Sequence, residues 1–232
     1  GAKDGSFHFY SSSVPEYILF KGGPNKDANN NFKSEKVSGK STTAVSKANY
    51  YDSDVSRTSN LKFDAEDGAT IEFWMKKDGF ASLASTVTET VFHLYNAGTA
   101  VGSTRGDLRI YLDGNTSVTD CFVRVVSGSI SKTFTLGTNL TSISDSSWHH
   151  YAFTIKNNGT SNLTIALYVD GKHAETIYTG SVINRVSGNI NATIGALATA
   201  PSASDSVASH GRPGLGYGKL SASLDEFRFW KT

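Results

Sequence analysis

The stretch from Trp148 to Gly171 constrains the fold more than any other part of the chain. Apolar residues occupy every second position from Leu163 to Val169, and Asn158-Gly159 and Asp170-Gly171 bound this run. A period of two residues is typical of a strand with one buried face, and Asn-Gly and Asp-Gly are strong hairpin signals. The stretch therefore predicts two antiparallel strands, Trp148 to Ile155 and Leu163 to Val169, with a further hairpin beginning at its end.

Short segments of the same kind recur along the chain, each bounded by Gly, Asn, Asp or Ser. In the middle of the chain their centres lie about ten to fifteen residues apart, which is typical of a meander that closes into a sandwich or jelly roll. No stretch keeps a helical period for longer than a turn or two. The expected strands are Ser6 to Tyr10 and Tyr17 to Phe20 at sheet edges, then Leu61 to Phe63, Ala69 to Lys77, Thr90 to Tyr95, Asp107 to Leu112, Cys121 to Val126, Ile130 to Leu136, Lys172 to Tyr178, Asn189 to Gly195 and Ser221 to Trp230.

Composition excludes two classes of partner. The 22 Lys and Arg residues nearly balance the 21 Asp and Glu residues, so the net charge is +1 and no basic stripe is present for nucleic acid. No apolar run is long enough to insert into a bilayer. The hydrophobic fraction of 38% is enough to fill the core of one large all-β domain. The single cysteine, Cys121, is interpreted as a small buried hydrophobe.

Four short motifs occur in an order that resembles a laminin-G-like module. They are ATIEFWMKK (69–77), WHHYAFT (148–154) followed by LYVDGK (167–172), IGA (194–196) and LDEFRFW (224–230). Laminin-G-like modules belong to the concanavalin A-like lectin and glucanase superfamily. The resemblance spans roughly residues 60 to 230 and implies an all-β, two-sheet antiparallel jelly-roll sandwich.

We predict a single domain over residues 1–232 with one long insertion at about 21–47. From Lys21 to Lys47 the composition shifts to Gly, Asn, Lys and Ser, and apolar residues are isolated. Such a composition predicts a long loop with weak structure of its own.

The sequence lacks the carboxylate pattern of a glycosidase. Retaining glucanases of the superfamily carry acidic residues at two-residue spacings on one strand. Here Glu72 is the only acidic residue in its strand. His149 and His150 are adjacent on a strand and so point to opposite faces, which is the wrong geometry for two ligands of one metal. The sequence therefore predicts a protein that is not an enzyme.

A structural calcium ion is the expected cofactor. The resemblance implies it, because Asp225 matches an acidic position of the family's terminal strand. Asp52 and Asp54 are the next candidates, since their spacing places two hard oxygen ligands on one side of an extended segment. The alternative is that Asp52 and Asp54 lie in a solvated turn and that Asp225 is a carboxylate at a strand start.

The preferred ligand-binding residues are His210, Arg212 and Tyr217. They lie near the end of a long loop, residues 196–218, that is rich in small residues. Binding residues concentrate on loops held by a rigid scaffold. A tyrosine ring can stack on the apolar side of a sugar, and arginine can donate two hydrogen bonds.

Two further positions are candidates for ligand contacts. Asp113 and Asn115 flank Gly114 in an expected hairpin turn and form the reserve set. Trp74 lies on the polar side of its strand, and two interpretations of it stand: a sugar-stacking platform, or packing beneath a loop.

We predict a non-catalytic module that binds a cell-surface glycan or a protein receptor. Its expected location is an extracellular or virion-surface protein, such as a phage fibre or tail, and its other partner would be the parent multidomain chain or virion. One alternative is a structural module that decorates a larger assembly and has no ligand. A second alternative is an accessory domain of a glycosidase.

Overall fold

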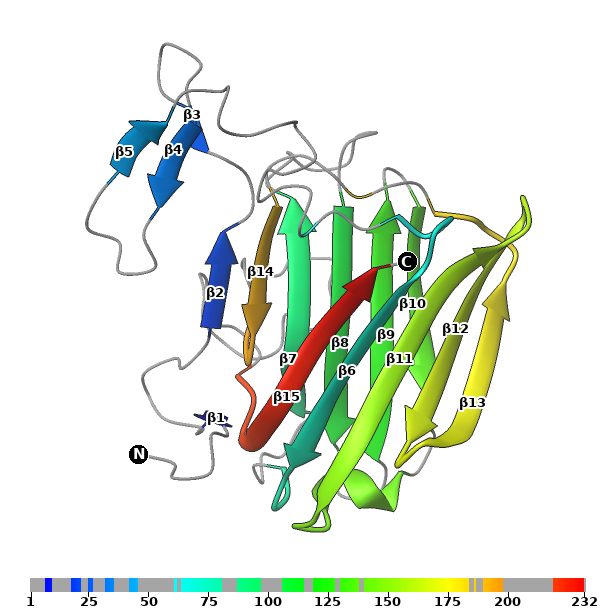
Figure 1. The fold of residues 1–232 in the computed structure, drawn as a ribbon. Helices are drawn as coiled ribbons and strands as arrows, with labels where there is room; N and C mark the ends of the chain where they lie inside the picture. The colour runs from blue at the N-terminus through cyan, green and yellow to red at the C-terminus, as the bar shows by residue number, and fades with distance from the viewer. Residues whose placement is uncertain are drawn as a thin grey trace.

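Two six-stranded antiparallel sheets form the body of the molecule, and a three-stranded sheet from strands within residues 25–45 lies to one side of them (Figure 1). A computed structural model describes residues 7–9, 18–21, 25–26, 32–35, 42–45, 61, 64–80, 87–96, 106–114, 119–127, 130–137, 140–183, 186, 190–197 and 219–231. Fifteen strands and one short 3-10 helix are the elements of this described part. The expected all-β, two-sheet sandwich is confirmed.

The first large sheet, sheet A, contains both terminal strands and the hairpin that the sequence analysis started from. It runs in the order β1 (Phe7–Phe9), β15 (Ala222–Lys231), β6 (Ala69–Lys76), β11 (Trp148–Asn158), β12 (Asn162–Val169) and β13 (Lys172–Thr179). Asp170 and Gly171 both have positive φ, 51° and 74°, at the turn between β12 and β13. A two-residue turn with two positive φ angles matches the right-handed twist of the strands that it joins.

The second large sheet, sheet B, packs behind sheet A in Figure 1. Its order is β10 (Ile130–Leu136), β9 (Thr119–Ser127), β8 (Gly106–Gly114), β7 (Val87–Asn96), β14 (Ile190–Ile194) and β2 (Ile18–Lys21). The short helix η3 (Thr141–Ser144) connects β10 to β11, and hence one sheet to the other. As expected, β1 and β2 are edge strands. The strand expected at Leu61 is wrong, because Leu61 is helical.

The core forms between the two sheets because alternate residues of each strand face inward. In β6 the buried residues are Ala69, Ile71, Phe73 and Met75, all at most 5% exposed. Contact between the sheets is direct, since the rings of Phe92 in β7 and Phe227 in β15 lie 5.2 Å apart. The intervening residues of β6 therefore point to the outer face of sheet A.

A buried ion pair fixes the start of β15 against β6 and β7. Lys77 Nζ lies 2.9 Å and 2.8 Å from the two carboxylate oxygens of Glu89, and it also donates to the carbonyl oxygen of Ser221 at 2.9 Å. The backbone N–H of Ser221 donates to Glu89 in turn, at 2.7 Å. Each charge thus has partners from two other segments, as a buried charge requires.

The segment expected as a long loop contains a small sheet, so the prediction of weak structure is wrong there. Strand β4 (Phe32–Glu35) pairs with both β3 (Asn25–Lys26) and β5 (Thr42–Val45). The register places Phe32 opposite Val45. Strand pairing thus gives opposite register positions to two apolar residues that are isolated in sequence, and β5 carries the β-branched residues that strands favour.

No helix in the part of the chain that the structure describes is both long and apolar enough to cross a membrane.

Candidate functional site on the outer face of sheet A

All three tryptophans of the chain lie on the outer face of sheet A. Trp74 of β6, Trp148 of β11 and Trp230 of β15 are 37%, 38% and 55% exposed. Tryptophan is highly buried on average in folded proteins. Exposed large apolar side chains that share one face are typical of an interaction surface.

Strand register arranges the three indoles along a line that we call the tryptophan diagonal. Trp230 pairs with Thr70, four residues before Trp74 on β6, and Trp148 pairs with Lys76, two residues after it. With a rise of about 3.3 Å per residue and strands about 4.8 Å apart, the diagonal crosses three strands over roughly 20 Å.

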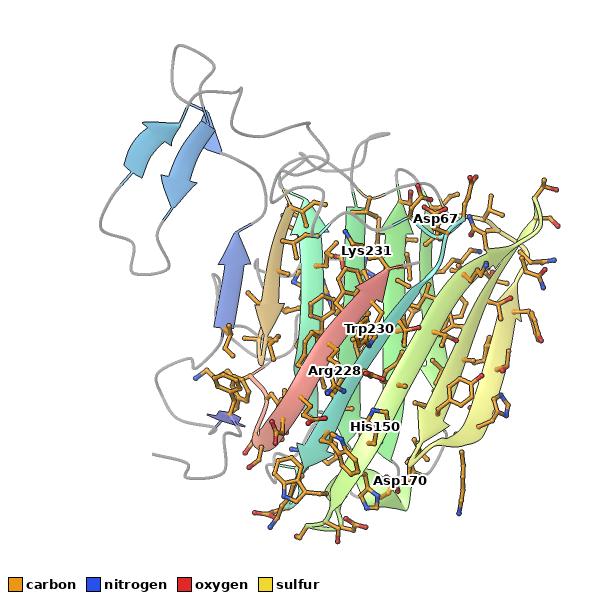
Figure 2. All side chains as sticks on the ribbon, viewed as in Figure 1. Asp67, His150, Asp170, Arg228, Trp230 and Lys231 are labelled. Carbon is orange, nitrogen blue, oxygen red and sulfur yellow. The ribbon has the colours of Figure 1, made fainter. Side chains whose placement is uncertain are left out.

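Polar side chains lie between the indoles. Glu72 Oε1 accepts hydrogen bonds from Trp230 Nε1 at 2.9 Å and from Arg228 Nη1 at 3.2 Å. His150 Nε2 lies 3.6 Å from the other oxygen, Oε2. These four residues, which we call the Glu72 cluster, come from β6, β11 and β15. Figure 2 shows Trp230, Arg228 and His150 on the face of sheet A that is turned toward the viewer.

The Glu72 cluster holds its groups in fixed orientations. The hydrogen bond from Trp230 holds the pKa of Glu72 below its ordinary value, and Arg228 and His150 act in the same direction against the effect of burial. The ring of His150 packs on Trp74, with 5.4 Å between centroids. Arg228 Nη2 also donates to Glu226 at 2.9 Å. The cluster therefore holds a partly exposed, ionised carboxylate and the oriented indole of Trp230, with Trp74 packed against its His150.

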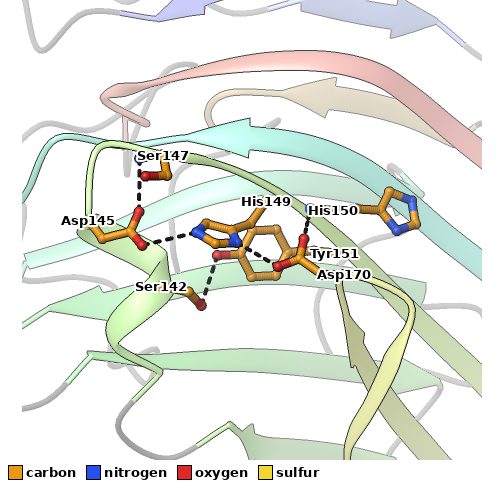
Figure 3. A network of polar contacts seen from close by, with 7 residues as sticks. All are labelled: Ser142, Asp145, Ser147, His149, His150, Tyr151 and Asp170. Atoms are coloured by element: carbon orange, nitrogen blue, oxygen red, sulfur yellow. Dashed lines mark hydrogen bonds and ion pairs between the residues drawn. The ribbon is translucent and has the colours of Figure 1, made fainter.

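A second polar network lies at one end of β11. The ring of His149 is held between Asp170, 2.7 Å from Nδ1, and Asp145, 3.0 Å from Nε2 (Figure 3). Asp170 also accepts the backbone N–H of His150 at 2.9 Å. The network ties the segment after η3 to the β12–β13 turn. His150 points to the opposite side of the strand, as the sequence analysis expected.

Sheet B carries a polar row on its own outer face, and this row is buried. The strand register aligns Thr193, His93, Arg109 and Arg124 across four strands, all at most 9% exposed. Asp107 lies 3.1 Å from Arg109 Nη2 and 3.3 Å from His93 Nε2. Burial alone would raise the pKa of Asp107, but Arg109 and His93 outweigh it and hold that pKa well below the ordinary value. We call this set the buried row.

The structure leaves most of the predicted site residues untested. His210, Arg212, Tyr217 and Asn115, with the calcium candidates Asp52 and Asp54, lie outside the described residues. Asp113 lies near the end of β8, where its backbone pairs with Asp120 of β9. Strands β8 and β9 therefore pair in antiparallel fashion as expected, but Asp113 and Gly114 lie in β8 and not in a turn. The binding role of Asp113 stays a prediction.

Asp225 lies on β15 directly opposite Trp74. Its Oδ1 accepts the backbone N–H of Glu226 at 2.7 Å, within a bulge where Glu226 has φ 47°. Among the described residues, no three His, Cys, Asp or Glu side chains gather in a group that could hold a metal ion. Calcium binding remains a prediction.

Sequence reasoning singled out Trp74 but missed the rest of the tryptophan diagonal. The signal was present in the alternation of two strands. In β11 the buried Tyr151 and Phe153 face the core, so the even-numbered residues, Trp148 among them, point outward. In β6 the buried Ile71 and Phe73 place Trp74 outward in the same way. Trp230 was harder to place because the bulge between Asp225 and Arg228 shifts the phase of β15.

A comparison with protein families agrees with the fold and with the four motifs of the sequence analysis. A model of laminin-G-like domains, described as the concanavalin A-like lectin/glucanases superfamily, matches residues 48–232. The chain belongs to this superfamily. Its laminin-G-like domains are typically extracellular, generally lack catalytic activity and bind glycans or proteins. No sequence among curated proteins matches the chain.

The solved structures that resemble the chain are distant from it in sequence. Domains LG4-5 of the mouse laminin alpha1 chain are 10% identical over 72% of this chain, with a TM-score of 0.46. A legume lectin-like domain from Entamoeba histolytica is 8% identical over 100% of it, also at 0.46. An alginate lyase from Pseudomonas aeruginosa is 9% identical over 72% of it, at 0.37. The chain spans 36%, 86% and 66% of these three structures respectively.

Proposed function

We propose that this chain is a non-catalytic glycan-binding module and that the glycan binds to the outer face of sheet A. The observation that carries the proposal is the position of the three tryptophans. All of them are exposed on one face of a laminin-G-like sandwich, and they flank an ordered carboxylate.

The chemistry of this face suits a sugar. An indole ring offers a flat apolar surface to the C–H groups of a pyranose, and polar groups beside it can bond the hydroxyls. Glu72 is an acceptor with further lone pairs available, because a carboxylate offers about four acceptor positions. Hydrogen bonds from hydroxyls to a charged acceptor are stronger than those between neutral groups.

The site lies on strands, which distinguishes it from the loop site of the sequence analysis. Trp74 and Glu72 share β6, a central strand held by β11 and β15 on its two sides. A site on paired strands is more rigid than one on loops, and less ordering is needed on binding. His210, Arg212 and Tyr217 remain a second proposed contact set, and the same assay tests them.

The absence of catalysis is part of the proposal. Hydrolysis of a glycosidic bond uses a pair of carboxyl groups, one of which must be protonated as the acid. Glu72 has a lowered pKa and is held by Arg228 and Trp230, so it is a poor proton donor at neutral pH. We also propose an extracellular setting as part of a larger chain, with the virion surface as one such setting.

A glycan array followed by calorimetry on the best ligand tests this function. We expect Trp74→Ala and Trp230→Ala each to weaken binding at least about tenfold, or about 1.4 kcal/mol. Tyr217→Ala and Arg212→Ala test the loop set in parallel. The matched control is Phe7→Ala, which removes an exposed aromatic ring of edge strand β1. If both tryptophan variants bind as tightly as wild type, the binding site does not lie on sheet A. If the wild-type protein binds no glycan at all, the result favours a structural module without a ligand.

A further inference from the structure

We infer that the outer face of sheet A takes an extended, uncharged polysaccharide chain laid along the tryptophan diagonal, rather than a single sugar or an acidic glycan. This inference rests on the proposed function and names the class of ligand. It follows from two separate observations, the length of the diagonal and the charges beside it.

The length argues for a chain of several sugars. The tryptophan diagonal spans roughly 20 Å by strand geometry, which is several times the width of one pyranose ring. A single ring stacked on Trp74 leaves Trp148 and Trp230 without a role. A linear chain that crosses β15, β6 and β11 obliquely meets all three indoles in turn.

The order of side chains supports the same path. From Trp230 the diagonal passes Arg228 and Glu72, which pair with each other across β15 and β6. It then reaches Trp74 with His150, which pair across β6 and β11, and ends at Trp148. Stacking surfaces and hydrogen-bonding groups thus alternate, as the faces and edges of successive sugar rings require.

The charges argue against an acidic ligand. Arg228 is engaged by two carboxylates, Glu72 at 3.2 Å and Glu226 at 2.9 Å. These two carboxylates offset the charge of Arg228, so its attraction for an incoming carboxylate or sulfate is reduced. When no calcium ion is bound, Asp225, which pairs with Trp74, adds a third negative charge beside the diagonal, against Arg228 and Lys76 as the positive ones. The field along this path favours neutral hydroxyls over anions.

The experiment compares neutral and anionic polysaccharides as probes. Wild-type protein is titrated with soluble β-glucan, xylan, mannan and galactan, and with alginate and hyaluronan, at low and high salt. We expect binding to at least one neutral polymer, insensitive to salt, and about tenfold tighter than to the matching disaccharide, because a disaccharide is too short to reach all three indoles. The loss caused by Trp148→Ala should grow with the length of the oligosaccharide.

The control is Tyr178→Ala, which removes an exposed aromatic ring from the same face. Tyr178 pairs with Thr164, on the β13 side of sheet A and away from the diagonal. We expect its affinity for the polymer to be unchanged. Thermal melting of each variant shows whether the protein is folded, so that a loss of affinity reports on the surface.

Two results would overturn the inference and leave the proposed function standing. One is a salt-sensitive preference for alginate or hyaluronan that Trp74→Ala abolishes. The other is a disaccharide that binds as tightly as the polymer and is insensitive to Trp148→Ala. If none of the probes binds and a glycan array is also negative, the proposed function itself fails.

Discussion

The outer faces of sheets A and B carry polar residues at equivalent alternating positions, but only one of them is open to solvent. On sheet A, Arg228 and Glu72 lie 3.2 Å apart among exposed indoles. On sheet B, Arg109 and Asp107 lie 3.1 Å apart, and both are 1% exposed. The two arginine–carboxylate pairs thus have similar nitrogen–oxygen distances, but one pair lies at the surface and the other is buried.

Their surroundings determine what each pair contributes. An exposed pair is screened by water and salt and adds little to stability. In a buried pair the attraction is strong, but each charge has lost its hydration and depends on its partner. The pair on sheet A is thus available for binding, whereas the pair on sheet B supports the fold.

The largest expected effect comes from breaking the buried pair. Asp107→Ala leaves Arg109 and His93 buried without their carboxylate. We expect a loss of about 3–5 kcal/mol in the free energy of unfolding, measured by urea denaturation. A loss below about 1 kcal/mol would show that water reaches the buried row and that the two faces are alike.

Calcium gives the next largest effect if the ion binds at Asp225. An ion that binds only the folded state adds about 2.7 kcal/mol at a hundredfold excess over Kd. We therefore expect calcium to raise the melting temperature and a chelator to lower it, with Asp225→Asn insensitive to both. An unchanged melting temperature in wild-type protein would exclude the ion. Without the ion, the only charges beside Trp74 on sheet A would be those of the protein's own side chains.

Breaking the exposed pair of Arg228 and Glu72 should change the stability of the protein only slightly. Glu72→Gln is thus the counterpart of Asp107→Ala on the other sheet. Glu72→Gln removes the charge that faces Arg228 but keeps an acceptor for Trp230. We expect a change below about 1 kcal/mol in the free energy of unfolding. A cost comparable to that of Asp107→Ala would contradict the contrast between the faces.

The smallest effect concerns His149 at the end of β11. Its pKa is raised, chiefly by the hydrogen bond to Asp170 and then by Asp145, against the effect of burial. Since the folded pKa lies above the unfolded value of about 6.5, this stabilisation is complete below about pH 6.5 and is lost as the pH rises through the folded pKa. NMR titration should place the pKa of His149 above 6.5, and Asp170→Asn should lower it more than Asp145→Asn.

The two aspartates set the acidic limit of the same network. The pKa of Asp145 is lowered, first by the backbone N–H of Ser147 and then by His149. That of Asp170 is also lowered, because His149 and the backbone of His150 outweigh burial. The contribution of these two carboxylates to the stability of the folded protein is present above about pH 4 and is lost as the pH falls through their folded pKa values. A pKa of His149 at or below 6.5 would contradict the geometry.

The sequence predicted most of the strands because alternation and turn residues are local signals. Ile130 to Leu136 was predicted with the bounds that the structure shows, and the Asp170-Gly171 turn has the positive φ angles that its residues favour. The strands of residues 25–45 were missed because their apolar residues meet only through pairing, which no local period reveals.

The site was harder to predict for a related reason. Alternation determines to which side of a sheet Trp74 or Arg109 points, but exposure depends on what covers that side. Glu72, Trp230 and His150 are far apart in sequence and come together only through the register of β6 with β15 and β11. That register could not be derived from the strands one at a time, and the bulge after Asp225 alters it further.

Tryptophan fluorescence during a glycan titration tests the central claim most directly. Since all three tryptophans lie on the outer face of sheet A, their emission reports on that face alone. With the neutral polysaccharide that binds in calorimetry, we expect a saturable change in emission whose midpoint matches the calorimetric Kd. Heat of binding without any change in emission would place the ligand elsewhere and contradict the assignment of the site to sheet A.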